Sequence, residues 1–207
     1  MITLLIDTSS SDVSIAILKS HHILSSKQKT LPNQHSIYTV SFIDEVLKKA
    51  GITPKEVNRI MVVTGPGSFT GLRIGVTIAK VYAYLENIEI IPISSLKMRA
   101  ISFSHENCLS LIDAHHNHYY VGLYNKDNQE IMKEQFMEKE EILKLIETYN
   151  PTIIADKEGK IDEIPYTKQE LNIEEIEKFY DKDKTVNPHL VNPNYLKLPQ
   201  ALEVKND

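Results

Sequence analysis

Apolar and polar residues alternate along the first half of the chain in a pattern that predicts strands interleaved with helices. Val13, Ile15 and Ile17 are separated by polar or small residues, as in a strand with one face buried. Farther on, apolar residues recur at helical spacing until Gly51, a standard helix terminator. The predicted elements are strands at residues 3–7, 12–19, 23–27, 59–64 and 89–93, and helices at residues 36–50 and 70–85.

The second half of the chain repeats this order. Leu4-Leu5-Ile6-Asp7 is echoed by Ser110-Leu111-Ile112-Asp113, and an apolar stretch begins eight residues after each aspartate. A repeated unit of three strands, a helix and a strand is therefore expected. Residues 156–188 are polar and charged and predict no element clearly. The second unit comprises strands at residues 110–113, 121–124, 130–136 and 152–155, and a helix at residues 139–149.

A glycine-rich turn separates the fourth predicted strand from the second helix. Four of the seven glycines lie between residues 65 and 75. A Walker loop needs Lys and then Ser or Thr after its last glycine, but Leu72 follows Gly71. A dinucleotide-binding loop would place its third glycine at Thr70. The turn is thus expected to expose backbone as a phosphate loop does, without belonging to either type.

Small residues then form a stripe along the helix that follows. Gly71, Gly75, Ala79 and Ala83 recur every four residues, and the remaining positions are mostly apolar. Such a helix is buried on more than one side, and its small residues allow another helix to approach closely. Two interpretations are open: the stripe packs on the chain's own sheet, or it is shared with a partner.

Composition limits the class of protein. The 207 residues include one cysteine, so no internal disulfide forms and a reducing compartment is expected. Asp7 interrupts the first apolar run, which predicts a cytoplasmic protein with neither signal peptide nor membrane span. The net charge of -5 and the absence of a basic cluster argue against direct tight binding of nucleic acid. The acidic stretch at residues 127–183 is interpreted as a solvated face.

Several motifs together resemble one family. Ile6-Asp7-Thr8-Ser9 resembles its first loop, His35-Ser36 the start of its first long helix, and residues 65–75 with Ala79-Lys80 its signature. Ser94-Ser95-Leu96, Asp113-Ala114 with Tyr120, and Pro193-Asn194-Tyr195-Leu196 complete the match. This is the TsaB (YeaZ) family, and the resemblance spans nearly the whole chain, most weakly at residues 126–189. His115, His118 and Lys197 depart from the family pattern.

The resemblance implies an α/β protein with the actin-like ATPase (ASKHA) fold, built from two ribonuclease H-like lobes of which the second is reduced. The expected domains are residues 1–103 for the first lobe, which carries the partner-binding helices, and residues 104–190 for the second. Residues 191–207 are expected to form a tail that returns to the first lobe. The chain would be a non-catalytic subunit in the formation of threonylcarbamoyladenosine next to the anticodon of tRNA.

The partners implied by the resemblance are a TsaD-type catalytic subunit in a heterodimer and a third, TsaE-type ATPase subunit. The chain alone would form a homodimer, would reach tRNA only through the complex, and would need no cofactor or metal. Two sets of residues carry over from the family motifs. The expected partner interface comprises His35, Ser36, Ile37, Val40, Ile43, Asp44, Leu47, Gly71, Gly75, Ile78, Ala79 and Tyr82. The expected signature loops comprise Asp7, Thr8, Ser9, Gly65, Pro66, Gly67, Ser68, Phe69, Thr70, Leu72 and Arg73.

Other functions remain open from the residues alone. Asp7 and Asp113 could face each other across a cleft, as in a carboxylate-dependent enzyme acting on nucleotides or RNA, although two carboxylates make a poor magnesium site. A glycoprotease-like peptidase would use Ser68 or Thr70 with His35 as base, but no third group orients the histidine. Strand alternation would separate His115 from His116 and His118, so a metal site there is disfavoured. A homodimeric scaffold unrelated to tRNA is the remaining alternative.

Overall fold

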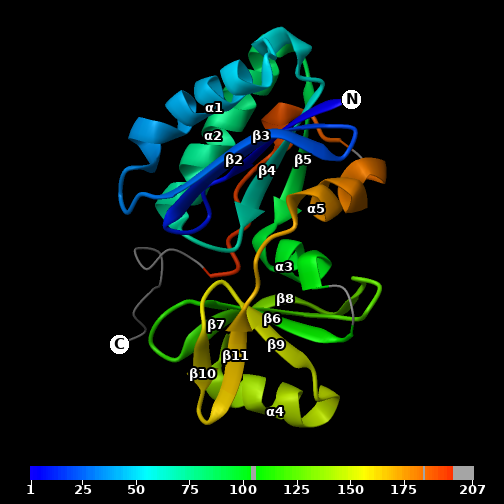
Figure 1. The fold of residues 1–207 in the computed structure, drawn as a ribbon. Helices are drawn as coiled ribbons and strands as arrows, with labels where there is room; N and C mark the ends of the chain where they lie inside the picture. Colours follow the sequence, from blue (N-terminus) through cyan, green and yellow to red (C-terminus); the bar gives the residue numbers. More distant parts are fainter. Residues whose placement is uncertain (104–105, 184, 198–207) are drawn as a thin grey trace.

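The computed structural model describes residues 1–103, 106–183 and 185–197 and contains two mixed β-sheets, one above the other in Figure 1. In the first sheet β1 pairs with β2 antiparallel and with β4 parallel. Thr3 to Ile6 of β1 are fully or almost fully buried because β1 lies at the centre of the sheet. In order across the sheet, the strands are β3 (His22–Thr30), β2 (Asp12–Lys19), β1 (Ile2–Asp7), β4 (Arg59–Gly65) and β5 (Glu89–Ser94).

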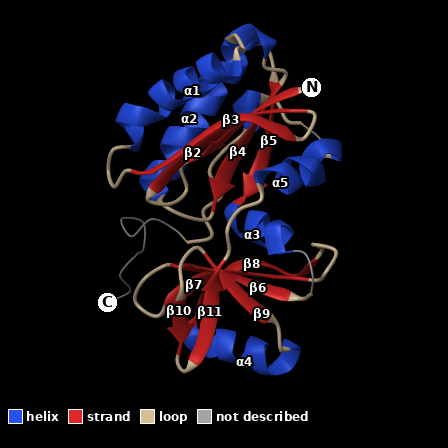
Figure 2. Cartoon of the chain, in the orientation of Figure 1, coloured by secondary structure: helices blue, strands red, loops and turns tan. Residues whose placement is uncertain are grey.

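Two long helices cover one face of this sheet, as Figure 2 shows. Helix α1 (His35–Ala50) ends at Gly51, whose left-handed φ of 67° confirms the predicted terminator. Helix α2 (Phe69–Glu86) follows the glycine-rich turn and ends at Asn87, also left-handed. Leu4 and Ile6 face the cluster formed with these helices, whereas Leu5 points to the opposite face, as alternation along a strand requires.

The second sheet repeats the first. Strand β6 pairs with β7 antiparallel and with β9 parallel, so the order β8-β7-β6-β9 matches β3-β2-β1-β4. The predicted repeat and the expected fold class of two α/β lobes with this topology are therefore confirmed. Helix α4 (Lys139–Tyr149) has the predicted bounds and covers the outer face. In order, the strands are β10 (Gly159–Ile161), β11 (Ile164–Lys168), β9 (Thr152–Ala155), β6 (Cys108–Asp113), β7 (His118–Tyr124) and β8 (Glu130–Glu138).

Two helices were not predicted by the sequence pattern. Helix α3 (Ser95–Phe103) lies between the sheets, with Met98 and Ile101 packed on the first and Leu96 and Ala100 on the second. A helix buried on both sides has no polar face, so its sequence shows no helical periodicity. Helix α5 (Ile173–Phe179) packs on the first sheet through Ile176. Three short 3₁₀ helices complete the described residues, at Pro54–Glu56, Tyr180–Lys182 and Pro188–Leu190.

The segments on either side of the second lobe contact the first. The stretch expected to belong to the second lobe, residues 104–190, includes α5, which packs on the first sheet. Val191 is buried in the first lobe's core, and the backbone N–H of Asn194 donates to the carbonyl of Thr64 at 2.7 Å. Residues 198–207 of the expected tail lie outside the described residues. Within the described ranges, no helix combines the length and apolar character needed to cross a bilayer.

Candidate functional site

A cavity of about 780 Å³ lies between the lobes. Segments at the C-terminal ends of the parallel strands of both sheets line it: residues 9–11 after β1, residues 66–69 after β4, residues 113–115 at the end of β6 and residues 156–157 after β9. Ligand sites of open α/β sheets form at this edge, beyond the carboxyl ends of the strands. Residues 194–197 of the C-terminal segment also line the cavity.

The glycine-rich turn packs tightly on the loop after β1. The N–H of Ser68 donates to the carbonyl of Ser9 at 2.7 Å, and a Cβ on Gly67 would lie 2.3 Å from that same oxygen. The Ser68 hydroxyl accepts from the N–H of Gly71 at 3.2 Å, which makes Ser68 the N-cap of α2. His35 Nε2 is hydrogen-bonded to the carbonyl of Ser10 at 2.9 Å. Ser68 and His35 of the peptidase hypothesis are therefore each hydrogen-bonded to backbone groups and not to one another.

At the start of α2, Arg73 forms an aromatic stack with the C-terminal segment. Its guanidinium lies 3.9 Å from the centre of the Phe69 ring, and its Nε donates to the hydroxyl of Tyr195 at 2.9 Å. The rings of Phe69 and Tyr195 stack with centroids 4.5 Å apart. The contact fixes Tyr195, a residue of the cavity wall, against α2.

The small-residue stripe of α2 faces inward, onto the loop after β1. A Cβ on Gly71 would lie 2.0 Å from the carbonyl oxygen of Thr8, and one on Gly75 would lie 2.2 Å from the Thr8 hydroxyl. The stripe lets α2 approach the chain's own loop after β1. Of the predicted interface residues, His35, Ile43, Leu47, Gly71, Gly75 and Ala79 are buried within this chain, and their assignment to a partner interface stays a prediction.

The outer faces of α1 and α2 do expose apolar side chains. Ile37 and Val40 on α1 are 67% and 59% exposed, and Val81 and Leu85 on α2 are 54% and 71% exposed. The two helices lie side by side over the sheet (Figure 1). We call these four residues the α1–α2 surface. Ser36 and Asp44 of the predicted interface are exposed, and Ile78 and Tyr82 are half-buried.

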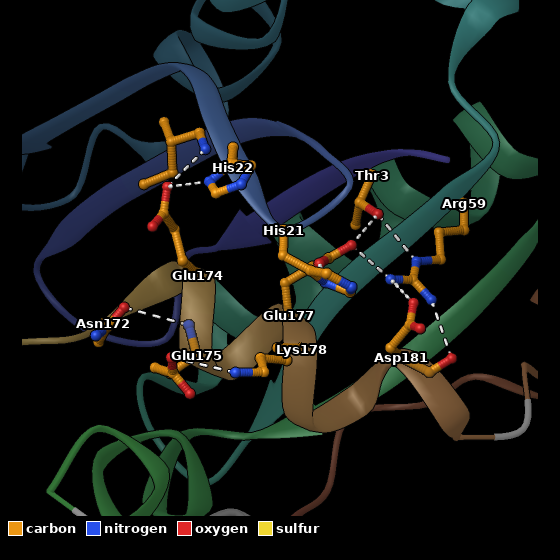
Figure 3. Close-up of polar contacts among 11 residues, drawn as sticks. Thr3, His21, His22, Arg59, Asn172, Glu174, Glu175, Glu177, Lys178 and Asp181 are labelled. Carbon is orange, nitrogen blue, oxygen red and sulfur yellow. Dashed lines mark hydrogen bonds and ion pairs between the residues drawn. The ribbon is translucent and has the colours of Figure 1, made fainter.

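A buried network of charges attaches α5 to the first sheet (Figure 3). Arg59 Nη2 donates to Glu177 Oε1 at 2.5 Å and to Asp181 Oδ1 at 3.0 Å, while the Thr3 hydroxyl donates to Glu177 at 2.8 Å. His21 Nδ1 also contacts Glu177. Among the described residues, His21, Glu177 and Asp181 are the one group close enough to share a metal ion. Arg59 already supplies the positive charge, so the arrangement is an ion-pair network that holds α5 in place.

The two aspartates of the enzyme hypothesis have different surroundings. Asp113 lines the cavity and is paired with Lys157 at 2.8 Å. Burial raises the pKa of Asp113, but the hydrogen bonds from Lys157 and from the N–H of His115 outweigh it, and the net shift is downward. Asp7 accepts from the N–H of Ser9 at 2.8 Å. The carboxylate of Asp113 is thus neutralised by a lysine of its own lobe, which is unsuited to holding a catalytic cation.

The histidine-rich segment after β6 is an exposed turn. His115, His116 and Asn117 all have left-handed φ angles, and only His118 belongs to a strand. The prediction that strand alternation places His116 and His118 on one face is wrong, because residues 115–117 form the hairpin turn. The sequence also gave no indication of Arg99 and Asp156, two charged residues of the cavity wall. Asp156 follows β9 as Asp113 follows β6, and that parallel could have indicated it.

The half-buried carboxylate of Glu134 connects the two lobes. Glu134 on β8 accepts hydrogen bonds from the hydroxyl of Tyr124 at 2.6 Å and from the hydroxyl of Ser94 at the end of β5. Burial raises the pKa of Glu134, and the two hydroxyls lower it in part. The contact with Ser94 crosses from the second sheet to the first, so it contributes to holding the cavity walls at a fixed separation.

Comparison with known proteins gives consistent results. The family model described as "TsaD: tRNA N6-adenosine threonylcarbamoyltransferase" matches residues 22–182. The tRNA threonylcarbamoyladenosine biosynthesis protein TsaB of Bacillus subtilis is 35% identical over 130 residues, which are 62% of this chain and 57% of that protein. The protein of the same name from Haemophilus influenzae is 34% identical over 126 residues, 58% of this chain and 52% of that one. The match thus spans little more than half the length of these relatives.

Among solved structures, YeaZ from Pseudomonas aeruginosa superposes with a TM-score of 0.80 at 21% sequence identity. The superposition covers 94% of this chain and 99% of that structure. At this level of identity the likeness establishes the fold, which extends over both lobes and the segments between them.

Proposed function

Because the chain belongs to the TsaB (YeaZ) family, within the larger family described by the tRNA N6-adenosine threonylcarbamoyltransferase model, we propose that it is a non-catalytic subunit in threonylcarbamoyl transfer to tRNA. It binds and supports a TsaD-type catalytic subunit, and the adenosine next to the anticodon is modified by that subunit. tRNA is reached through the complex, which also includes a TsaE-type ATPase. The proposal concerns this chain as a binding partner and assigns no catalytic residue to it.

The observation that supports this function is the α1–α2 surface. Ile37, Val40, Val81 and Leu85 are large apolar side chains exposed on two adjacent helices. Exposed apolar patches of this kind mark sites of protein association. A catalytic subunit of the same family would offer an equivalent helix pair, and two such pairs pack as a four-helix arrangement with interhelical distances of roughly 8–10 Å. In the absence of that subunit, the same surface drives pairing of two copies of this chain.

The charge of the chain fits the same role. The net charge is -5, and the acidic α5 is bound through Glu177 to the chain's own Arg59. A surface that binds tRNA by itself would present clustered Lys and Arg side chains, which release counterions from the phosphates. Recognition of tRNA therefore belongs to the other subunits of the complex.

The experiment is threonylcarbamoyladenosine formation on unmodified tRNA by the catalytic and ATPase subunits of the same organism, with and without this chain. Activity should require the chain, and the chain alone should show none. Val40→Asp and Val81→Asp should each weaken binding to the catalytic subunit by about 30-fold, the scale of a lost hot spot of roughly 2 kcal/mol. Leu24→Asp is the matched control, because Leu24 is also an exposed apolar residue of the first lobe but lies on β3.

Two results would contradict the proposal. Full modification activity without the chain would contradict the proposed function. Unchanged affinity in both the Val40→Asp and the Val81→Asp variants would remove the α1–α2 surface as the binding site, even if activity required the chain. Measuring binding by calorimetry alongside activity separates the two results.

A further inference from the structure

Arg99 on α3 is a buried charged side chain with few protein partners. It is 7% exposed, and it lines the cavity between the lobes. Its Nη1 donates to the carbonyl of Ser95 at 2.5 Å, and its other N–H groups have no acceptor among the described residues. A guanidinium carries five N–H donors, so most of its hydrogen-bonding capacity is unused. A buried charge left in this state is costly unless a partner of opposite charge is present.

Asp156 presents the opposite charge to the same cavity. It follows β9 in the second lobe, and its Oδ1 is shielded from solvent and accepts no hydrogen bond from any described residue. Burial lowers the pKa of Arg99, while the carboxylates of Asp156 and Asp7 act to raise it. The two charges thus attract each other, yet no direct ion pair joins them. In contrast, the neighbouring Asp113 and Lys157 form a direct ion pair, with Lys157 Nζ 2.8 Å from Asp113 Oδ2.

The glycines near the cavity are not arranged to bind phosphate. A Cβ on Gly65 would meet the carbonyl of Asn194 at 2.7 Å, one on Gly67 the carbonyl of Ser9, and one on Gly71 the carbonyl of Thr8. Each glycine thus allows close packing within the chain. The carboxylate of Asp156 in the wall would also repel a polyphosphate. The charges therefore favour a ligand that carries both an acceptor and a donor.

We propose that the cavity binds a small molecule carrying a carboxylate and an adjacent N–H donor, an amino acid or an N-acyl amino acid. The carboxylate accepts from the free N–H groups of Arg99, whose planar fork matches a carboxylate. The N–H group donates to the carboxylate of Asp156, which only accepts. The volume of about 780 Å³ lies within the range of roughly 300–1,000 Å³ typical of small-molecule sites. Binding joins the lobes, because α3 and the loop after β9 supply the two contacts.

The test uses the fact that the chain has only three arginines, Arg59, Arg73 and Arg99. In ¹⁵N-labelled protein their side-chain Nε–H resonances are few enough to follow, and Arg99→Lys identifies that of Arg99. The probes are glycine and N-acetylglycine, each with both groups, acetate and methylammonium, each with one group, and ATP. Glycine and N-acetylglycine should shift the Arg99 resonance in a saturable way, and each should bind at least about tenfold more tightly than acetate.

Two carboxylate-to-amide variants complete the test. Asp156→Asn should weaken glycine binding by about tenfold relative to acetate binding, because the negative charge that attracts the ammonium group is lost. Glu163→Gln is the matched control, since Glu163 is 96% exposed on the turn between β10 and β11. Thermal unfolding of each variant checks that it folds. The titration of the wild-type protein tests the proposal even if a variant does not fold.

Three outcomes would overturn the proposal. If no probe shifts the Arg99 resonance, water alone satisfies the two side chains. If acetate binds as tightly as glycine and Asp156→Asn changes neither affinity, the site is a simple anion site. If ATP binds more tightly than glycine and shifts the same resonance, the cavity is a nucleotide site. None of these outcomes affects subunit binding through the α1–α2 surface, which the glycine titration does not involve.

Discussion

Substitution of Glu177 by Gln tests the buried ion-pair network directly. Glu177 is 1% exposed and accepts from Thr3 at 2.8 Å, from Arg59 at 2.5 Å and from His21. Glutamine keeps the shape of the side chain but removes the charge that neutralises Arg59, itself 4% exposed. Removing one member of a buried pair costs roughly 3–5 kcal/mol of the free energy of unfolding. Because Arg59 retains Asp181 at 3.0 Å, we expect the lower end, about 3 kcal/mol at neutral pH.

The effect should depend on pH with a defined sign. Burial raises the pKa of Glu177, but the hydrogen bonds from Thr3, Arg59 and His21 outweigh it, and the pKa in the folded protein lies below 4.5. A carboxyl group with a lowered pKa stabilises the fold above its unfolded pKa, and this contribution is lost as the pH falls through the folded value. The stability difference between wild type and Glu177→Gln should therefore be full at pH 7 and shrink below about pH 4.5.

Urea unfolding at pH 7 and at lower pH values provides the measurement. Circular dichroism and tyrosine fluorescence should give coincident transitions, since a two-lobed chain need not unfold in one step. With a slope of about 1–3 kcal/mol per molar urea, a loss of 3 kcal/mol lowers the midpoint by about 1 M or more. Glu175→Gln is the control on the same helix, because Glu175 is exposed and pairs with Lys178 only at 3.8 Å. A loss below about 1 kcal/mol at pH 7, or a difference independent of pH, would refute the reasoning.

Two further predictions concern the core. Gly71→Ala should destabilise the fold by about 1–3 kcal/mol in the same urea assay, because its Cβ would lie 2.0 Å from the backbone oxygen of Thr8. Gly51→Ala should cost only about 1 kcal/mol, because Gly51 has a φ of 67° but open space around it. Equal losses for the two variants would contradict the inward packing of α2. Cys108 is 1% exposed, and burial raises its pKa to about 12. The thiol should therefore resist a thiol reagent at pH 7 in the native protein and react once per chain in urea. Rapid labelling of the native protein would contradict this burial.

The elements of regular pattern were predictable from the sequence. Strands β1 and β2, the helix over residues 139–149 and the terminator Gly51 all depend on local periodicity or on a single backbone preference. The repeat of the first unit in the second was also visible, because a buried strand that ends in Asp occurs in both. Helices α3 and α5 were not predictable, since the first is buried on two sides and the second lies in an acidic stretch whose partner, Arg59, is far away in the sequence.

The family, the two-lobe α/β fold and a tightly packed helix after the glycine-rich turn could all be inferred from the sequence. These features depend on the order of residues along the chain and on local backbone geometry. Which face of that helix is free depends on tertiary packing: Gly71 and Gly75 pack on Thr8, while Val81 and Leu85 remain exposed. Tertiary packing also decided that Arg99 and Asp156 line one cavity. Helical periodicity defines the faces of a helix, but only the packing of distant segments determines which face is covered.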